Sequence, residues 1–228
     1  MVVMAAAVFL SAALSILLAI GMAVLATAEV DIQRRDADPA DGFKRVELTE
    51  RNFKLQKPYD VPLEKRYSFK NGVHRLWVYD DDKPFKPHST TLPRTEIRIK
   101  GLDYSSGVWQ FEGYAFVPKG SHGVTIFQIH GGRTISTLTL QLRVIGNDLW
   151  YFWKKPIVPN IVDRWFKLNV IHDIEKGKLS VIVDGDLKIV GKDGGKGACY
   201  FKCGVYSCRK KASHYMEARW KNIKIYKK

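Results

Sequence analysis

Three short segments of the sequence carry side chains that could bind an anion and move a proton. They are Arg94–Ile99, Phe127–His130 and Tyr200–Tyr206. Successive side chains of a β-strand point to opposite faces, so each segment has a polar face and an apolar face. If the three strands are neighbours in one sheet, their polar faces form a strip of arginine, glutamine, histidine, lysine and tyrosine. Such a strip offers hydrogen-bond donors, one potential base and phenol groups.

The simplest alternative is that each strand merely has a solvated face, which is the commonest fate of an amphipathic strand. A lone histidine such as His130 is also more often a structural residue, with its hydrogen bonds satisfied, than a catalyst. A solvated face, however, favours lysine, glutamate and threonine over histidine, glutamine and paired tyrosines. Glu96 lies between Arg94 and Arg98. We expect it to hold both guanidinium groups in place through charge-assisted hydrogen bonds.

Strand signals separated by short turns recur along most of the chain, whereas helical periodicity is nearly absent and Asp60–Arg66 forms at best a short helix or turn. The dipeptides Asn71-Gly72 and Asp184-Gly185 are typical of tight turns between strands. We therefore predict an all-β protein, a sandwich of two antiparallel sheets. The predicted strands are Phe43–Leu48, Phe53–Gln56, Val73–Tyr79, Arg94–Ile99, Gly107–Val117, Val124–His130, Thr137–Ile145, Leu149–Trp153, Trp165–His172, Lys178–Val183, Lys188–Val190, Ala198–Tyr206 and Glu217–Tyr226.

The N-terminal segment does not read as part of this fold. Residues 1–28 carry no charged side chain and end in Ala26-Thr27-Ala28, so we predict a cleaved signal peptide. An uncleaved anchor helix is the alternative, because the apolar run is long enough to span a bilayer. Residues 29–42 are expected to be a flexible mature N-terminus and 43–228 a single domain. The mature protein is then secreted or vacuolar, with no stable membrane insertion, and we expect a monomer.

The composition of the chain points to an anionic partner. Lys and Arg number 37 against 23 Asp and Glu, a formal net charge of +14. An exported protein with this charge meets acidic polysaccharides more often than nucleic acid, so we expect no nucleic-acid partner. Three cysteines, Cys199, Cys203 and Cys208, are predicted to be free and largely buried, since a strand would hold the first two too far apart to bridge. A zinc site with His214 is disfavoured for the same reason, and no metal is expected.

The motifs Arg-Thr-Glu-Ile-Arg at 94–98, Gln-Ile-His at 128–130 and Tyr-Phe-Lys-Cys-Gly-Val-Tyr at 200–206 resemble, in order and spacing, the signature segments of polysaccharide lyase family 7, the alginate lyase 2 domain. That family is a β jelly roll with a substrate groove across its concave sheet. The stretches 57–62, 71–79 and 93–97 look closer still to the plant citrate-binding proteins, which are secretory or vacuolar members of the same superfamily. The resemblance runs from about Asp41 to the C-terminus.

This resemblance implies roles for individual residues. Arg94 and Gln128 would hold the substrate carboxylate, His130 would abstract a proton or neutralise the carboxylate, and Tyr206 would be the general acid, with a role as base also open. The remaining groove residues implied to contact substrate are Lys202, Arg98, Arg143 and Tyr200. The sequence also departs from the lyases: Cys203 stands where they have alanine, and Ser207-Cys208 stands where they continue with Asn-Gln.

Three functions follow as hypotheses. The first is a lyase that cleaves a 4-linked polyuronate by β-elimination and needs no cofactor, because Arg94, Gln128 and His130 would stabilise the charge that develops on the carboxylate. The second is a non-catalytic protein that binds citrate or a similar small carboxylate in the same groove. The third is a basic lectin that binds cell-wall glycans through exposed aromatic residues, for which the candidates are Trp150, Tyr151, Phe152 and Trp153.

Overall fold

The computed structural model describes residues 38–134, 137–208 and 212–228. The predicted signal peptide, residues 1–28, and most of the predicted flexible segment 29–42 lie outside the described residues. Gly42–Lys228 forms one compact unit. Within the described residues, no helix has the length and apolar character needed to cross a membrane.

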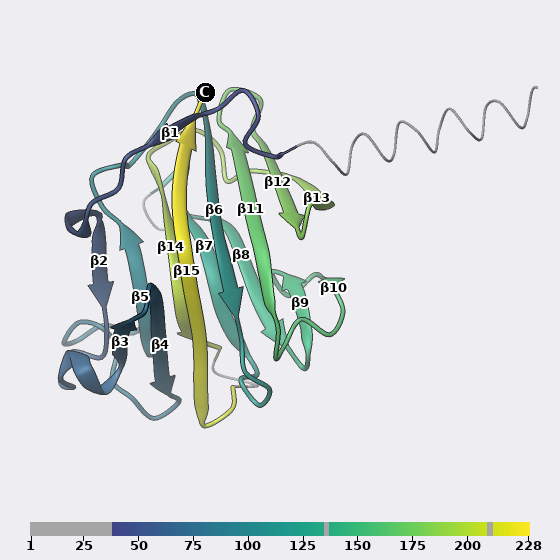
Figure 1. Ribbon diagram of the computed structural model, residues 1–228. Coiled ribbons are helices and arrows are strands. Elements are labelled where there is room, and N and C mark those ends of the chain that lie inside the picture. Colours follow the sequence, from purple (N-terminus) through teal and green to yellow (C-terminus); the bar gives the residue numbers. More distant parts are fainter. Residues whose placement is uncertain (1–37, 135–136, 209–211) are drawn as a thin grey trace, which may run out of the picture. The chain divides into compact units, whose positions relative to one another are not determined.

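This unit is an all-β sandwich of two antiparallel sheets (Figure 1). The strands of the first sheet are β1 (Lys44–Val46), β3 (Tyr67–Lys70), β4 (Val73–Tyr79), β6 (Val108–Phe116), β11 (Trp165–Asp173), β12 (Lys178–Val183), β13 (Asp186–Lys192) and β15 (Tyr215–Lys227). Those of the second sheet are β2 (Phe53–Gln56), β5 (Arg94–Ile99), β7 (Val124–Gly131), β8 (Leu138–Ile145), β9 (Asp148–Tyr151), β10 (Lys155–Val158) and β14 (Cys199–Ser207). Two short 3₁₀ helices, η1 (Glu50–Asn52) and η2 (Leu63–Lys65), lie before β2 and β3.

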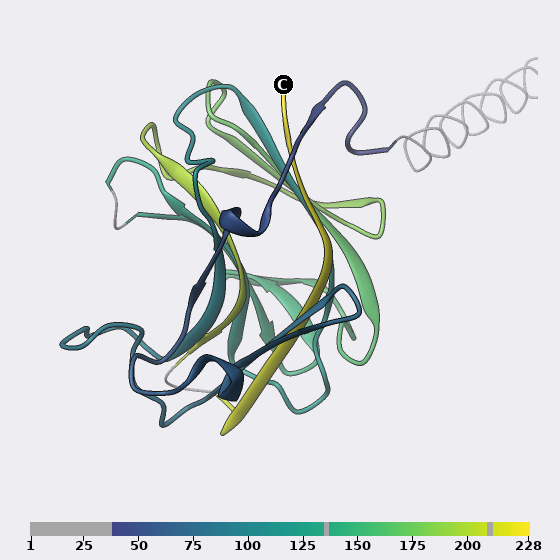
Figure 2. The ribbon, with the colours of Figure 1, turned by 60° about the vertical axis from the view of Figure 1, so that its left-hand side comes forward.

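The order of the strands shows how segments far apart in the sequence become neighbours. The first sheet runs β13-β12-β11-β6-β15-β4-β3, with β1 paired to β15, and the second runs β10-β9-β8-β7-β14-β5-β2. Figure 2 shows the two layers from the side, with the long yellow strand β15 in one layer facing the other. In the second sheet β14 lies between β7 and β5, so the three chemically suggestive segments share one sheet.

The core between the sheets is built from the apolar faces of these strands. Phe111 of β6 lies 4.7 Å from Phe127 of β7 and 5.9 Å from Phe201 of β14, measured between ring centroids. Trp220 of β15 meets Phe111 edge-on at 5.7 Å. All four rings are buried. Edge-to-face and tilted ring pairs of this kind stabilise a core beyond the area they bury. The core therefore fixes the second sheet rigidly from its inner side.

The predicted strands are confirmed with small shifts at their ends, and two strands were missed. The missed strands are β3 and β10, both of four residues. The predicted strand Leu149–Trp153 is too long: Phe152 has a positive φ of 51°, which ends β9 at Tyr151. Both predicted turn dipeptides, Asn71-Gly72 and Asp184-Gly185, have positive φ at each residue, as a tight hairpin turn requires.

Candidate active site

The polar face of the second sheet brings the three predicted segments together. Tyr206 of β14 lies opposite Arg94 of β5, and Lys202 lies between Arg98 of β5 and Gln128 of β7. Tyr200 lies opposite His130 of β7. Directly opposed residues share a face of the sheet. A shared site requires these strands to be neighbours, and the registers show that they are.

Gly204 lets β14 approach β5 closely enough to place Tyr206 beside Arg94. Its φ is 140°, and a Cβ at this position would lie 2.5 Å from the carbonyl oxygen of Thr95 and 2.7 Å from the Cα of Glu96. Any side chain would therefore push the two backbones apart. The glycine of the motif is thus required for steric reasons, because it sets the separation of the two strands that carry the candidate residues Arg94 and Tyr206.

Glu96 is the centre of a buried hydrogen-bond network. Its carboxylate accepts hydrogen bonds from Gln128 and Lys202, and from Arg94 with Nη1 3.3 Å from Oε2. The prediction that Glu96 holds both neighbouring arginines is right for Arg94 and wrong for Arg98, which pairs with Asp103 instead. Lys202, expected to line the groove, is only 1% exposed because it points to Glu96. Burial lowers the pKa of Lys202 to about 8, against the pull of Glu96 in the other direction.

The network extends sideways to β8. Gln141 donates from Nε2 to Oε1 of Gln128 over 3.1 Å, and Arg143 donates to Oε1 of Gln141. The carboxamide of Gln128 is therefore oriented on both sides, with its oxygen toward Gln141 and its nitrogen toward Glu96. Buried polar networks in which each group has a partner hold side chains in one geometry.

His130 has an unsatisfied ring nitrogen on this face. Its ring stacks on Tyr200 with centroids 5.2 Å apart and planes 15° apart, and the Arg98 guanidinium covers Tyr200 at 4.0 Å. Nδ1 of His130 is buried and has no hydrogen-bond partner among the described residues. Burial, followed by the charge of Lys202, lowers the pKa of His130 to about 4. The imidazole is therefore neutral near pH 7 and can accept a proton.

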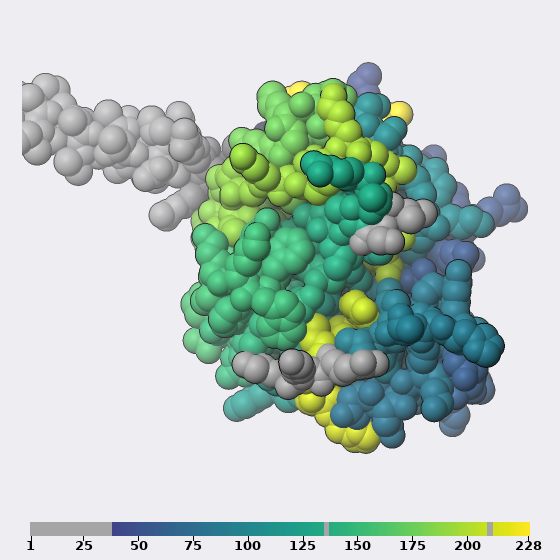
Figure 3. Space-filling view, turned by 180° about the vertical axis from the view of Figure 1, so that it is seen from behind, coloured from purple at the N-terminus to yellow at the C-terminus, as the bar shows by residue number. Residues whose placement is uncertain are grey.

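Tyr206 lies against Arg94 at one side of the network. The guanidinium of Arg94 lies 4.0 Å from the centre of the Tyr206 ring and 5.3 Å from that of Phe85, so two aromatic rings pack against Arg94. A cavity of ≈ 330 Å³ opens beside Tyr206 toward Arg143. Figure 3 views the molecule from the side of this sheet: green residues of the middle of the chain flank one side, blue residues flank the other, and yellow atoms show between them.

The structure brings all eight predicted site residues onto one face, but they differ in how far they are exposed to solvent. Arg94, Gln128, Arg143 and Lys202 are buried, whereas Arg98, His130, Tyr200 and Tyr206 are partly exposed. Sequence reasoning missed the part that Gln141 plays in orienting Gln128. Its signal was available, because Gln141 alternates with Arg143 on the polar face of β8. It also missed Phe85, which lies in a segment between strands and carries no sequence signal.

The aromatic residues proposed for a lectin do not form a platform. Tyr151 is part of the core, and of the four residues only Trp153 is a large exposed hydrophobic side chain, at 48%. Its ring lies 4.4 Å from the guanidinium of Arg143. Trp153 thus belongs to the edge of the candidate site rather than to a separate binding surface.

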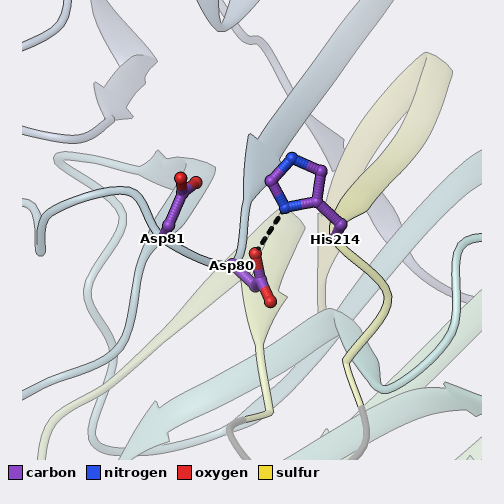
Figure 4. A group of neighbouring side chains, drawn as sticks. All are labelled: Asp80, Asp81 and His214. Carbon is purple, nitrogen blue, oxygen red and sulfur yellow. Dashed lines mark hydrogen bonds and ion pairs between the residues drawn. The ribbon is translucent and has the colours of Figure 1, made fainter.

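The three cysteines are free and buried, as predicted. His214, which the sequence analysis considered beside them, lies instead with Asp80 and Asp81 (Figure 4). These three side chains are exposed, and their potential ligand atoms lie within 4.8 Å of one another. Figure 4 shows the imidazole directed at Asp80, to which Nδ1 is bonded at 2.7 Å. That hydrogen bond raises the pKa of His214 and accounts for its orientation.

The depressed pKa of His130 predicts an acid-side loss of stability. Between about pH 6.5, its ordinary pKa, and about 4, its value in the fold, the unfolded chain binds a proton that the folded chain refuses. Stability therefore falls as the pH falls through this window. We expect the melting temperature of His130→Gln to decline less steeply than that of the wild type between pH 7 and 4.5. Parallel declines would contradict a buried neutral imidazole.

Fold and site together define a jelly-roll protein whose second sheet carries a polar face centred on a buried glutamate. The alginate lyase family model matches residues 46–227, and the chain belongs to this family. A citrate-binding protein of Hevea brasiliensis is 56% identical over 191 residues, which cover 84% of this chain and 80% of that protein.

Solved alginate lyases share the fold. The polysaccharide lyase family 7 enzyme AlgAT5 superposes with a TM-score of 0.60 at 18% identity, over 76% of this chain and 93% of its own. Alginate lyase A1-II′ of the same family gives 0.61 at 14% identity, over 77% and 95%. At these identities the likeness is one of architecture. It supports the jelly roll predicted from the sequence.

Proposed function

We propose that the protein is a polysaccharide lyase that cleaves a 4-linked polyuronate by β-elimination. The observation that carries this proposal is the placement of a neutral His130 and the phenol of Tyr206 on adjacent strands around the network centred on Glu96. A base and an acid thus flank fixed donors. Preorganised donors aimed at developing charge are usually the largest contribution to such catalysis.

The proposed reaction follows from the acidity of the uronate. The proton on C5 becomes removable only when the adjacent carboxylate is neutralised, which Arg94 and the second N–H of Gln128 would do. His130 takes the C5 proton, the C5–H electron pair forms the C4–C5 double bond, and the C4–O4 bond breaks. Tyr206 protonates the departing O4. Glu96 does not touch substrate in this scheme; it positions Arg94, Gln128 and Lys202.

The test is incubation of the whole chain with glucuronan and with alginate, followed by ultraviolet absorbance of the unsaturated product. We expect absorbance to rise on at least one of the polymers. The acid limb of kcat/KM should then follow the free protein's His130, with an apparent pKa near 4. Absence of product across several polyuronates would contradict the lyase proposal.

A second candidate is a protein that binds citrate or a similar carboxylate without turnover. The name of the 56% identical relative favours it. So does the departure at Ser207-Cys208, which both line the cavity beside Tyr206. Both candidates use Arg94, Gln128 and His130, so binding of citrate alone does not separate them. Saturable citrate binding together with no cleavage of any polyuronate would favour the second.

A further inference from the structure

A cavity at one end of the polar face is lined by a positively charged side chain, Arg143. It has a volume of ≈ 330 Å³ and is open to solvent along part of its wall. The residues that line it are Leu92, Leu138, Gln141, Arg143, Trp153, Tyr206, Ser207 and Cys208. Among the described residues that line the cavity, Arg143 is the one charged side chain. The cavity therefore presents a guanidinium group, two hydroxyl groups and an indole ring to a small ligand.

Arg143 is buried without a counter-charge. The residue is 9% exposed, its Nη2 donates to the neutral Gln141, and its Nε has no hydrogen-bond partner. No acidic side chain of residues 38–134, 137–208 and 212–228 forms an ion pair with it. The other two arginines of this face differ, since Arg94 pairs with Glu96 and Arg98 with Asp103.

A buried charge without a partner is costly, and the cost is relieved when an anion arrives. Burial lowers the pKa of Arg143, which reports the same penalty. The indole of Trp153 covers the guanidinium at 4.4 Å but does not neutralise it. Arginine binds carboxylates through paired, charge-assisted hydrogen bonds, so a carboxylate is the ligand that fits a partly desolvated guanidinium with a free Nε.

The sheet registers place this guanidinium on the far side of Tyr206 from Arg94. Tyr206 pairs with Arg94 on β5 and with Thr125 on β7, and Thr125 pairs with Arg143 on β8. The two arginine backbones are thus three strands apart, roughly 14 Å at the usual spacing between strands. The guanidinium of Arg94 lies over the Tyr206 ring, and Arg143 lines the same cavity as Tyr206. One anion-binding group lies on each side of the proposed general acid.

We propose that the Arg143 cavity is a second carboxylate subsite, distinct from the one at Arg94. It would take the carboxylate of the sugar residue next to the one that His130 and Tyr206 act on, with Trp153 as a stacking surface for that sugar. The proposal that this carboxylate belongs to a polyuronate rests on the proposed lyase function. A small polycarboxylate such as citrate offers the same chemical group, and the experiment below distinguishes the two ligands.

Arg143→Met tests the subsite, with calorimetric binding of citrate and of a saturated tetraglucuronate as the two arms. Arg164→Met is the matched control, because it removes the same charge elsewhere: the Arg164 side chain is 41% exposed and pairs with Asp184. We expect Arg143→Met to weaken one of the two ligands at least tenfold and the control to change neither by more than twofold. Loss of tetraglucuronate affinity assigns the subsite to a polymer, and loss of citrate affinity to a small carboxylate.

The ligand-free melting temperature separates binding from a structural role. Because Arg143→Met removes an uncompensated buried charge, the melting temperature of this variant should equal or exceed that of the wild type. If Arg143 were instead a structural residue, the melting temperature would fall. A Trp153→Phe variant provides a second measurement: the change in tryptophan emission on ligand binding should largely disappear. Wild-type affinities for both ligands in Arg143→Met, or an unchanged emission signal in Trp153→Phe, would overturn the subsite.

Failure of the lyase proposal can be recognised separately. If the wild type releases no unsaturated product while Arg143→Met loses citrate affinity, turnover is wrong and the subsite stands. If Arg143→Met cleaves polyuronate with wild-type KM and binds both ligands normally, turnover is right and the subsite is wrong.

Discussion

Replacing Tyr206 by phenylalanine is expected to lower kcat for polyuronate cleavage by about 10²–10⁴-fold, the usual contribution of a positioned general acid. The ring that stacks on Arg94 at 4.0 Å remains, so the guanidinium keeps its place. What is lost is the proton donor for the departing O4. Binding of a saturated oligouronate should stay within a few-fold of wild type. Steady-state rates and calorimetric affinities measure the two effects independently.

Tyr114→Phe is the matched control, because Tyr114 lies on β6 in the other sheet and also loses one phenol group. Its kcat should equal that of the wild type. If Tyr206→Phe retained wild-type turnover, another group would have to protonate the leaving oxygen. An equal loss of affinity and of kcat would instead make Tyr206 a binding residue.

The sequence predicts the fold well because alternation is a local property. Strands such as Val73–Tyr79 and Arg94–Ile99 show their buried faces in their own residues, and their bounds were predicted correctly. The two missed strands lack this signal. β3 reads Tyr-Ser-Phe-Lys, and β10 reads Lys-Pro-Ile-Val at the edge of its sheet, where proline is tolerated. Such segments become strands because they pair with neighbouring strands, and not because their own residues alternate between apolar and polar.

The site could be predicted only in part, since its electrostatics depend on contacts between distant segments. Alternation places Arg94 and Arg98 equally beside Glu96, but the second arginine turns to Asp103, which no local pattern could position. The burial of Lys202 could not be predicted for the same reason. A lysine on a polar face is expected to be exposed, and only the three-dimensional structure shows that Lys202 pairs with Glu96. The sequence therefore indicated which candidate residues share a face of the sheet, but not which of them pair with one another.

Glu96→Gln is expected to destabilise the fold by about 3–5 kcal/mol, the usual cost of removing one member of a buried ion pair. Glu96 is 1% exposed and accepts hydrogen bonds from three buried partners, two of them cationic. Without its charge, Lys202 and Arg94 are left in the interior uncompensated. Urea unfolding at pH 7 measures the loss, and activity should fall as Gln128 and Arg94 lose their anchor.

Asp103→Asn is the matched control for this change. It also removes one acidic partner of an arginine on the polar face, but Asp103 is exposed, and the Arg98–Asp103 pair has 23% and 41% of its side-chain surfaces accessible. Exposed pairs contribute roughly 0–1 kcal/mol. A loss in Glu96→Gln as small as that in Asp103→Asn would show that the buried cations do not depend on Glu96.

The pH dependence of the Glu96→Gln loss identifies which cation needs the carboxylate. The pKa of Lys202 is about 8 in the fold against 10.5 for an ordinary lysine. In this window the unfolded chain holds a proton that the folded chain has released, so the penalty of burying Lys202 is relieved as the pH rises. Above about pH 8 the wild-type amine is neutral and no longer requires Glu96. The difference in unfolding free energy between wild type and Glu96→Gln should therefore shrink from pH 7 to pH 9.5, leaving the part due to Arg94. A constant difference would assign the whole effect to Arg94 and remove Lys202 from the ionic network.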